Sequence, residues 1–378
     1  MINLKKKKSK NLQAQSRICL MLLHFIIVLF MANTQLLHAQ INKTLPDSIL
    51  NAGSIDEIKF SSGKFEISSN IYIPATKAQK YPLVIWVSGS GPSYKTVQSV
   101  QAKKIINLFL QRGIAYFRID KPGYGDSKGK VDDANLFSQL SEIVVDAVNI
   151  LKKRTEIDST RIGLFGSSQA GYIMPIAASK SKLISFIIGS SCPGENSIDQ
   201  WNYLIYKQML CEGYSKKRAM KNAEMFNILR TTSDKAKFDE ALIYFEKNPM
   251  IIKSVNYDST LINGARTWWP REIDVNDESH FNPVTLIQKL NIPVYMVYGE
   301  NDTQIDSKQA YAAYRNALSK SGNKYFGVEM LKGVDHNMCS TETGCLNEIN
   351  RLNKEGKYKY SQLYFDVINN WIKLLFKK

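Results

Sequence analysis

The chain has 378 residues, a length that suits one large domain or one domain with an insertion. Hydrophobic residues make up 44% of the chain and charged residues 22%, which excludes a disordered or collagen-like protein. The formal charge of +16 first suggests a nucleic-acid partner, but the positions of the charges weaken that interpretation.

The N-terminus has the order of a secretory signal peptide. Residues 1–17 carry six Lys and Arg and no acid, residues 18–31 are apolar, and small Ala39 ends the segment. The apolar run of about 14 residues is shorter than the ~20 that a membrane span needs. We therefore expect residues 1–39 to be removed after Ala39, which makes the protein periplasmic or secreted. An uncleaved membrane anchor is the alternative.

Loss of this segment changes what the charge implies. It removes six of the 50 basic residues and none of the 34 acidic ones, and the remaining positive charge is dispersed. We expect no nucleic-acid partner and no stable membrane insertion after cleavage. His280 and His336, the two histidines that remain, are not at metal-ligand spacing, so we expect no metal site.

The mature chain keeps four cysteines, and an exported protein can form disulfides. Cys339 and Cys345 are separated by Ser-Thr-Glu-Thr-Gly, which can turn back, so we expect them to pair. A Cys192–Cys211 bond is a weaker expectation. A bond from Cys192 or Cys211 to the loop of Cys339 and Cys345 is the remaining alternative.

Apolar strand patterns alternate with amphipathic helical patterns along the first half of the chain. We predict two strands within 55–73, strands at 83–87, 114–119, 161–165 and 184–188, and helices at 97–111, 136–154 and 168–179. Fully apolar strands that alternate with helices indicate a mostly parallel, doubly wound sheet with both faces covered. The fold class is therefore α/β.

The alternation stops in residues 192–281, which are helical in pattern and rich in Lys, Tyr and Met. It resumes with strands at 294–298 and 325–331 and helices at 307–318 and 361–376. We predict one α/β core from residues 40–191 and 282–378. A helical insertion, residues 192–281, interrupts it.

The third apolar run leads into Gly166, then Ser167, Ser168 and a helix of small residues. A serine in a sharp strand-to-helix turn is held above the sheet, and the turn requires small residues two positions to either side. Gly166 and Ala170 meet that requirement around Ser168. Ser167 is the competing nucleophile, but it lacks the glycine two residues before it.

A nucleophilic serine needs a base and an acid that orients it, in the chain order Ser, acid, His for this architecture. His336 follows the last predicted strand, whereas His280 precedes any strand that can carry the acid. Asp302 lies in the loop beyond strand 294–298. Glu300 is too near the turn, and Asp306 has the position of a helix cap.

The oxyanion formed by serine attack needs two preset N–H donors. We expect them to be the backbone N–H groups of Gln169, which follows Ser168, and of Ser90 in Gly89-Ser-Gly-Pro92, with Gly91 next to the substrate. A dinucleotide-binding loop is the rival interpretation. It fails because Tyr94 and Lys128 stand where the third glycine of Gly-x-Gly-x-x-Gly belongs.

Taken in order, these motifs resemble the α/β-hydrolase superfamily over residues 55–376. The motifs are Gly-Ser-Gly-Pro at 89–92, Asp-Lys-Pro-Gly-Tyr-Gly-Asp-Ser at 120–127, the Ser168 turn, Phe-Asn-Pro at 281–283, Gly-Glu-Asn-Asp at 299–302 and Asp335-His336. The Gly-Ser-Gly-Pro loop resembles the corresponding loop of a subgroup of carboxylesterases and acyl thioesterases. This subgroup is related to prolyl oligopeptidase-like and serine aminopeptidase-like enzymes. Ala170 and Ser88 depart from the usual pattern. The resemblance implies no cofactor and a cap formed by the insertion.

These features predict an exported serine hydrolase that cleaves a small-molecule carboxylic ester or other acyl substrate through Ser168, Asp302 and His336. A peptidase, an aminopeptidase or a thioesterase with the same three residues is the alternative, and a catalytically silent binding protein is the non-enzyme alternative. Trp268 and Trp269, with Trp201, are candidates for an aromatic wall around the substrate. Simple packing within the insertion is the competing explanation for them.

Overall fold

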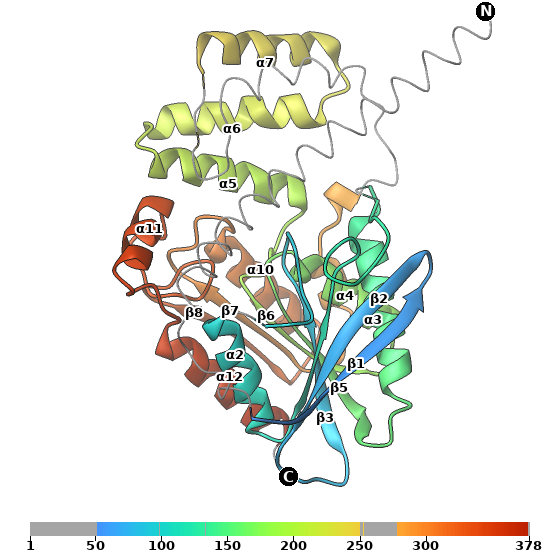
Figure 1. Cartoon of the computed structure of the whole chain (residues 1–378). Coiled ribbons are helices and arrows are strands. Elements are labelled where there is room, and N and C mark those ends of the chain that lie inside the picture. The colour runs from blue at the N-terminus through green and yellow to red at the C-terminus, as the bar shows by residue number, and fades with distance from the viewer. Residues whose placement is uncertain (1–50, 98, 133, 250–251, 253–277, 377–378) are drawn as a thin grey trace, which may run out of the picture.

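The computed structural model describes residues 51–97, 99–132, 134–249, 252 and 278–376 (Figure 1). An eight-stranded sheet in the order β1-β2-β4-β3-β5-β6-β7-β8 forms its centre. The strands are β1 (Ala52–Ser62), β2 (Phe65–Pro74), β3 (Tyr81–Val87), β4 (Ala115–Ile119), β5 (Ile157–Ser167), β6 (Ile184–Ser190), β7 (Val294–Gly299) and β8 (Phe326–Leu331). β1, β2 and β4 pair antiparallel, and all pairs from β4 to β8 are parallel, which confirms the predicted α/β class.

Helices cover both faces of the sheet because its strands are apolar on both sides. Leu83 and Ile85 of β3 pack in one core with α3, α4 and α10, and Val84 packs in a second core with α2 and α12. Alternate side chains of a strand point to opposite faces, so one apolar run supplies both cores. The helices are α2 (Val100–Leu110), α3 (Leu136–Leu151), α4 (Ala170–Lys180), α10 (Ser307–Lys320) and α12 (Gln362–Leu375).

The predicted elements agree with these bounds to within a few residues, but the shortest helices of the described core escaped prediction. Asp306 is the N-cap of α10 as expected, and its side chain accepts from the Gln309 N–H (3.1 Å). The short helix α11 (Leu346–Lys354) has no counterpart in the prediction. Two further short elements, η4 (Glu278–His280) and α9 (Val284–Ile287), precede β7.

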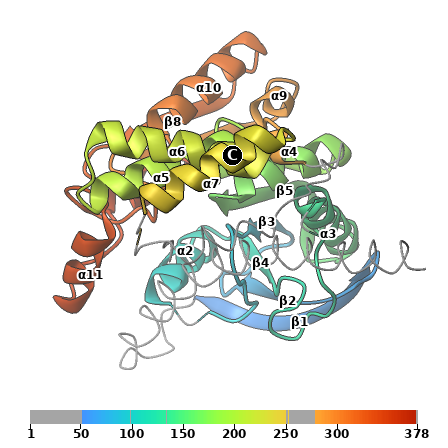
Figure 2. The ribbon, with the colours of Figure 1, turned by 90° about the horizontal axis from the view of Figure 1, so that it is seen from above.

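Within the described residues, three helices between β6 and residue 249 stack beyond the carboxyl ends of the parallel strands (Figure 1). They are α5 (Ser197–Cys211), α6 (Lys216–Thr231) and α7 (Lys235–Lys247), and we call them the cap helices. They have a hydrophobic cluster of their own that includes Ile205, Phe226 and Phe238. Seen from above in Figure 2, they lie away from β1 and β2. α5, the first of them, follows the carboxyl end of β6 and so brings the cap helices to this edge of the sheet.

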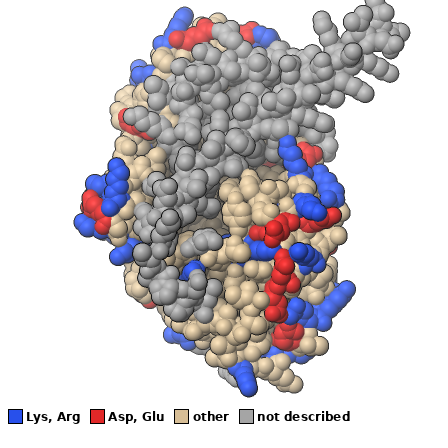
Figure 3. Space-filling view, in the orientation of Figure 1, with Lys and Arg blue, Asp and Glu red and all other residues tan. Residues whose placement is uncertain are grey.

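The face of the molecule shown in Figure 3 mixes charges of both signs. Along β1 and β2 the basic side chains pair with acidic ones, such as Lys59 with Glu57 (3.7 Å) and Lys128 with Glu66 (2.9 Å). Paired, interspersed charges are typical of a solvated surface, whereas nucleic-acid binding needs a basic patch or stripe.

Candidate active site

Ser168 stands in the sharp turn between β5 and α4. Its φ angle is +56°, in the left-handed region that non-glycine residues seldom adopt. Its N–H donates to the Ser190 carbonyl at the end of β6 (3.0 Å), and its own carbonyl accepts from Gly171 N–H (2.8 Å). Ser167 remains in β5, paired with Ser190. A strand–turn–helix geometry with strain at the serine is the one expected of a nucleophile.

Close packing explains the small residues of this turn. A Cβ atom at Gly166 would lie 2.6 Å from both the Ala170 methyl carbon and the Val87 carbonyl oxygen, so only glycine fits there. Ala170 itself is fully buried. Its methyl group occupies the space that the missing side chain of Gly166 leaves, so alanine is compatible with the turn.

The structure brings Asp302 and His336 together. Asp302 follows β7 and His336 follows β8, and Nδ1 of the imidazole lies 2.8 Å from Oδ2 of the carboxylate. The other carboxylate oxygen accepts the N–H groups of Gln304 and Ile305, both at 2.8 Å. His280, the rival base, lies exposed on η4.

Burial and charge act in opposite directions on this histidine. Burial disfavours the imidazolium, but the Asp302 carboxylate outweighs it through charge and a hydrogen bond, and Asp335 adds to the effect. The pKa of His336 is therefore raised above its ordinary value. With Nδ1–H donating to Asp302, Nε2 is free to accept a proton.

Asp335, which the sequence motif included but to which no role was given, organises the turn that carries His336. Its carboxylate accepts the N–H groups of Asn337 (2.9 Å) and Cys339 (3.0 Å) and the hydroxyl of Tyr358 (2.7 Å). Burial raises the pKa of Asp335 to about 6, although these donors favour the carboxylate. The Asp-His dipeptide in the sequence was the available signal.

The loop after β3 packs directly against the serine turn. A Cβ atom at Gly89 would lie 3.2 Å from Cβ of Ser168, so the Gly89–Gly91 backbone can come this close only because position 89 lacks a side chain. Gly91 has φ +87°, which glycine adopts readily. Ser90, between them, and Gln169, the N-cap position of α4, are thus on the two segments that meet at Ser168.

The side chain of Lys121 binds the loop of Gly89 to Gly91, a contact that was not predicted from the sequence. Its Nζ donates to the carbonyl oxygens of Gly89 (2.5 Å) and Gly91 (3.2 Å). Removal from water lowers the pKa of Lys121 to about 7. The lysine lies in the Asp-Lys-Pro-Gly motif after β4, which was noted in the sequence without a function.

Residues 63–332 match the X-Pro dipeptidyl-peptidase (S15) family. The chain belongs to this family. An Escherichia coli protein of 31.7 kDa, encoded in the traX–finO intergenic region and without an assigned function, is 23% identical over 257 residues, which cover 65% of this chain and 81% of that protein. Family membership makes the chain a serine hydrolase.

Two solved structures support the fold of this S15-family chain. An esterase from Pyrococcus furiosus superposes with a TM-score of 0.51 at 13% identity, covering 88% of this chain and 94% of the esterase. An α/β-hydrolase from a Penicillium species gives 0.50 at 14% identity, covering 86% and 100%. A proposed dipeptidyl aminopeptidase IV from Bacteroides ovatus gives 0.48 at 14% identity over 82% of this chain, which spans only 36% of that protein. The S15-family chain has the α/β-hydrolase fold.

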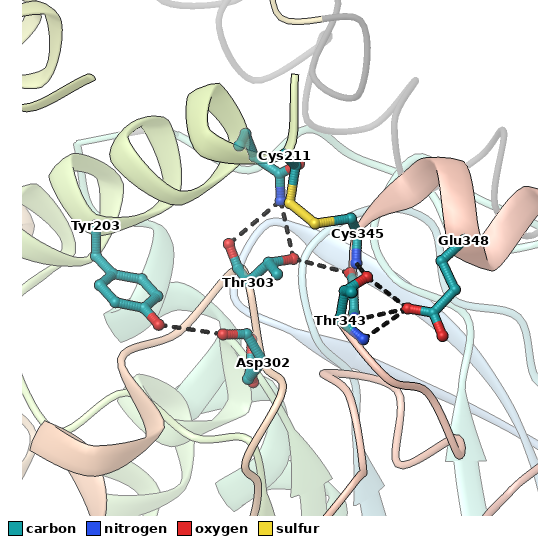
Figure 4. Close-up of a disulfide and its surroundings, with 9 residues drawn as sticks. Tyr203, Cys211, Asp302, Thr303, Thr343, Cys345 and Glu348 are labelled. Atoms are coloured by element: carbon teal, nitrogen blue, oxygen red, sulfur yellow. Dashed lines mark hydrogen bonds between the residues drawn. A yellow bond between two sulfur atoms is a disulfide. The ribbon is translucent and has the colours of Figure 1, made fainter. Parts of the chain in front are cut away.

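The expected disulfide is wrong. Cys211, the last residue of α5, is bonded to Cys345, the residue before α11 (Figure 4), and Cys192 and Cys339 are buried free thiols. Cys339 is turned inward because its backbone pairs with Tyr360 and its N–H donates to Asp335. Spacing in sequence gave no information on the approach of α5 to this loop.

Hydrogen bonds add to this covalent link by joining α5 to the loop that carries Asp302 (Figure 4). Gln208 donates to the carbonyl (3.2 Å) and hydroxyl (3.0 Å) of Thr303, and the Thr303 hydroxyl donates to the Gly344 carbonyl (3.1 Å). Tyr203 donates to the Asp302 carbonyl (3.1 Å). The first cap helix is therefore part of the structure that surrounds Asp302.

A small cavity beside His336 lies between α5 and α11. It is lined by Gln208, Thr303, Gln304, Asp335, His336, Asn337, Gly344, Leu346 and Ile349. Of the aromatic residues proposed as a substrate wall, Trp268 and Trp269 lie outside the described residues. Trp201 lies under the guanidinium of Arg230 (5.2 Å to the ring centre) and packs against the cap cluster.

Over the ranges that the structure describes, no three His, Cys, Asp or Glu side chains are grouped to hold a metal ion. Every helix in those same ranges is too short or too polar to cross a membrane.

Proposed function

We propose that this S15-family protein is an exported hydrolase of carboxylic esters that works through an acyl-Ser168 intermediate. One observation carries the proposal. Ser168 is held at φ +56° after β5, and a hydrogen-bonded Asp302–His336 pair follows β7 and β8 of the same parallel sheet. The carboxyl ends of parallel strands meet at one edge, so the three residues share that edge.

The chemistry follows from these positions. His336 Nε2 accepts the Ser168 proton while Oγ attacks the ester carbonyl carbon, and the N–H groups of Ser90 and Gln169 stabilise the oxyanion. His336 then protonates the departing alcohol, which leaves acyl-Ser168. Water repeats the sequence and releases the acid, so no cofactor is required. Asp302 keeps the imidazole in the required tautomer and favours its charged form.

A second candidate, a peptidase, is favoured by the family match itself. A peptidase that acts at the amino terminus of its substrate needs a carboxylate to bind the substrate ammonium. Glu195, in the loop from β6 to α5, is the carboxylate we would test. Burial, then the charges of Asp199 and Asp306, raise the pKa of Glu195 to about 7. At neutral pH this group is only partly charged, which makes it a poor ammonium partner in the free enzyme.

A substrate panel separates the candidates. The wild-type protein and Ser168→Ala would be assayed with nitrophenyl esters, nitrophenyl thioesters and aminoacyl- and X-Pro-anilides. Ester hydrolysis that Ser168→Ala abolishes supports the proposal. Anilide hydrolysis that Glu195→Gln weakens, with ester hydrolysis unchanged, would instead assign a peptidase. A thioester preference would assign a thioesterase.

The non-enzyme alternative is a binding protein with the same fold. A fluorophosphonate probe reacts covalently with an activated serine. Labelling of wild type at Ser168, mapped by peptide mass spectrometry, supports an enzyme. Absence of labelling in wild type, with a folded protein by circular dichroism, would support the binding protein.

The proposal also includes export of the protein from the cytoplasm. It is supported by the leader-like residues 1–39 and by the Cys211–Cys345 disulfide, a bond typical of oxidising compartments. Cell fractionation with N-terminal sequencing tests it. A periplasmic or secreted chain that starts after Ala39 is the expected result. A membrane fraction that retains residues 1–39 would favour the anchored alternative, and a cytoplasmic chain would contradict both.

A further inference from the structure

The residue that follows β6 has an unusual backbone. Among the described residues, three that are not glycine have positive φ, and they are Ser168, Ser191 and Met338. Ser168 carries the proposed nucleophile and Met338 lies in the turn of His336. Ser191 has no place in the reaction described above, although its φ is +49° and it is fully buried. Backbone strain at such a position persists only where the surroundings impose it.

The contacts of Ser191 account for this strain. Its N–H continues the sheet by donating to the Val297 carbonyl of β7 (2.9 Å). Its side chain turns the other way, and Oγ donates to the carbonyl oxygen of His336 (2.9 Å). The positive φ lets one residue make both bonds.

Ser190, the residue before Ser191, makes the corresponding contact with the turn of Ser168. The Ser190 carbonyl accepts the N–H of Ser168 (3.0 Å), and its hydroxyl shares a hydrogen bond with Tyr364 (2.9 Å). Two consecutive residues at the end of β6 thus bind the nucleophile turn and the base turn. β6 lies between β5, which precedes the turn of Ser168, and the pair β7 and β8, of which β8 precedes the turn of His336, so this dipeptide connects the two turns.

From these contacts we propose that Ser191 is a positioning residue for the hydrolytic reaction. It sets the place of His336 relative to Ser168 by holding the His336 main-chain carbonyl. The inference rests on the proposed function, in which His336 takes the Ser168 proton. Asp302 and Asp335 fix the imidazole and the turn around it, but the bond from Ser191 links that turn to the strand beside the nucleophile.

The test uses the full-length mature protein with Ser191→Ala and Ser191→Gly. Both lose the hydroxyl, and glycine also tolerates φ +49° without strain. Ser185→Ala is the matched control, because Ser185 lies at the other end of β6 and its Oγ donates to the Ile162 carbonyl at the same 2.9 Å distance. The readouts are kcat and KM for the best ester, and the saturating rate of fluorophosphonate labelling at Ser168.

We expect Ser191→Ala and Ser191→Gly to lower kcat and the labelling rate about 10- to 100-fold with KM within about threefold, because a displaced base slows proton transfer. Ser185→Ala should stay within about twofold of wild type. If both Ser191 variants keep wild-type kcat, the inference is overturned. If Ser191→Gly is fully active and only Ser191→Ala is slow, strain and not the hydroxyl is responsible, which overturns it too. If wild-type Ser168 is never labelled, the proposed function fails instead.

Discussion

The ammonium group of Lys121 donates a 2.5 Å hydrogen bond to the carbonyl of Gly89, the residue whose backbone packs against Ser168. A second bond from the same nitrogen reaches Gly91, so Ser90 is held between two anchored glycines. The loop that supplies the proposed oxyanion donor is thus positioned by a side chain from the end of β4.

Replacing this lysine should therefore impair catalysis. We expect Lys121→Met to lower kcat about 10- to 100-fold, because removing a whole oxyanion donor costs about 10²–10³ and here the donor is only displaced. Lys128→Met is the control, since Lys128 lies in the same loop, is largely exposed and pairs with Glu66. Steady-state kinetics on an ester measure both. Equal activity of the two variants would contradict a role for Lys121.

Ser168→Ala should leave the fold intact and lower kcat by about 10⁶, since acyl transfer has no other nucleophile. Ser167→Ala is the neighbouring control, and its residue stays within β5. Circular dichroism and ester hydrolysis are the measurements. The serine assignment is wrong if Ser167→Ala is inactive while Ser168→Ala keeps a tenth of the activity.

Activity should rise with pH above the ordinary histidine range. The base must be neutral, and the pKa of His336 is raised, so the rise in kcat/KM lies above pH ~6.5. Because the pKa of His336 is raised in the folded state, folding favours its protonated form. Its contribution to the free energy of unfolding is therefore complete below pH ~6.5 and is lost as the pH rises through the raised pKa. The proposed base thus becomes active where its contribution to stability declines.

Variants identify the group behind this profile. Asp302→Asn removes the carboxylate that raises the pKa of His336, so the rise should move to lower pH and kcat should fall about 10³–10⁴-fold. His280→Gln should leave both the profile and kcat unchanged. A profile lost in His280→Gln and kept in His336→Gln would reverse the assignment.

Loss of the Cys211–Cys345 bond should destabilise the protein by about 2–4 kcal/mol, because it closes a loop with a sequence separation of 134 residues. Reductant should lower the thermal midpoint of wild type and not that of Cys211→Ser/Cys345→Ser. Thiol titration in denaturant should find Cys192 and Cys339 free before reduction. A midpoint that reductant does not change in wild type would argue against the bond.

The features that were predicted correctly from the sequence are those that depend on a local pattern of residues. The apolar runs located the central strands, such as β3, because these strands are buried on both faces. Gly166 located the turn of Ser168 because only glycine fits between Val87 and Ala170. The pairing of Asp302 with His336 followed from a rule of chain order. It required no knowledge of how the loops approach each other.

What escaped prediction depends on contacts between distant segments. Lys121 reaches Gly89 across 32 positions of sequence, and Ser191 reaches His336 across 145. The disulfide joins a cap helix to a loop, and Cys339 was the nearer partner for Cys345 in sequence alone. α11 is only nine residues long, so its amphipathic pattern covers little more than two helical turns.

The attachment of α5 divides the cap into a fixed part and an exchangeable part. Gln208 and Cys211 bind α5 to the acid loop and to the start of α11, whereas α6 and α7 pack mainly on each other and on α5. For protein engineering, the graft point is therefore the turn after Cys211. Chimeras that exchange α6 and α7 keep the contacts between α5 and the acid loop, whereas a graft that begins at Ser197 removes them.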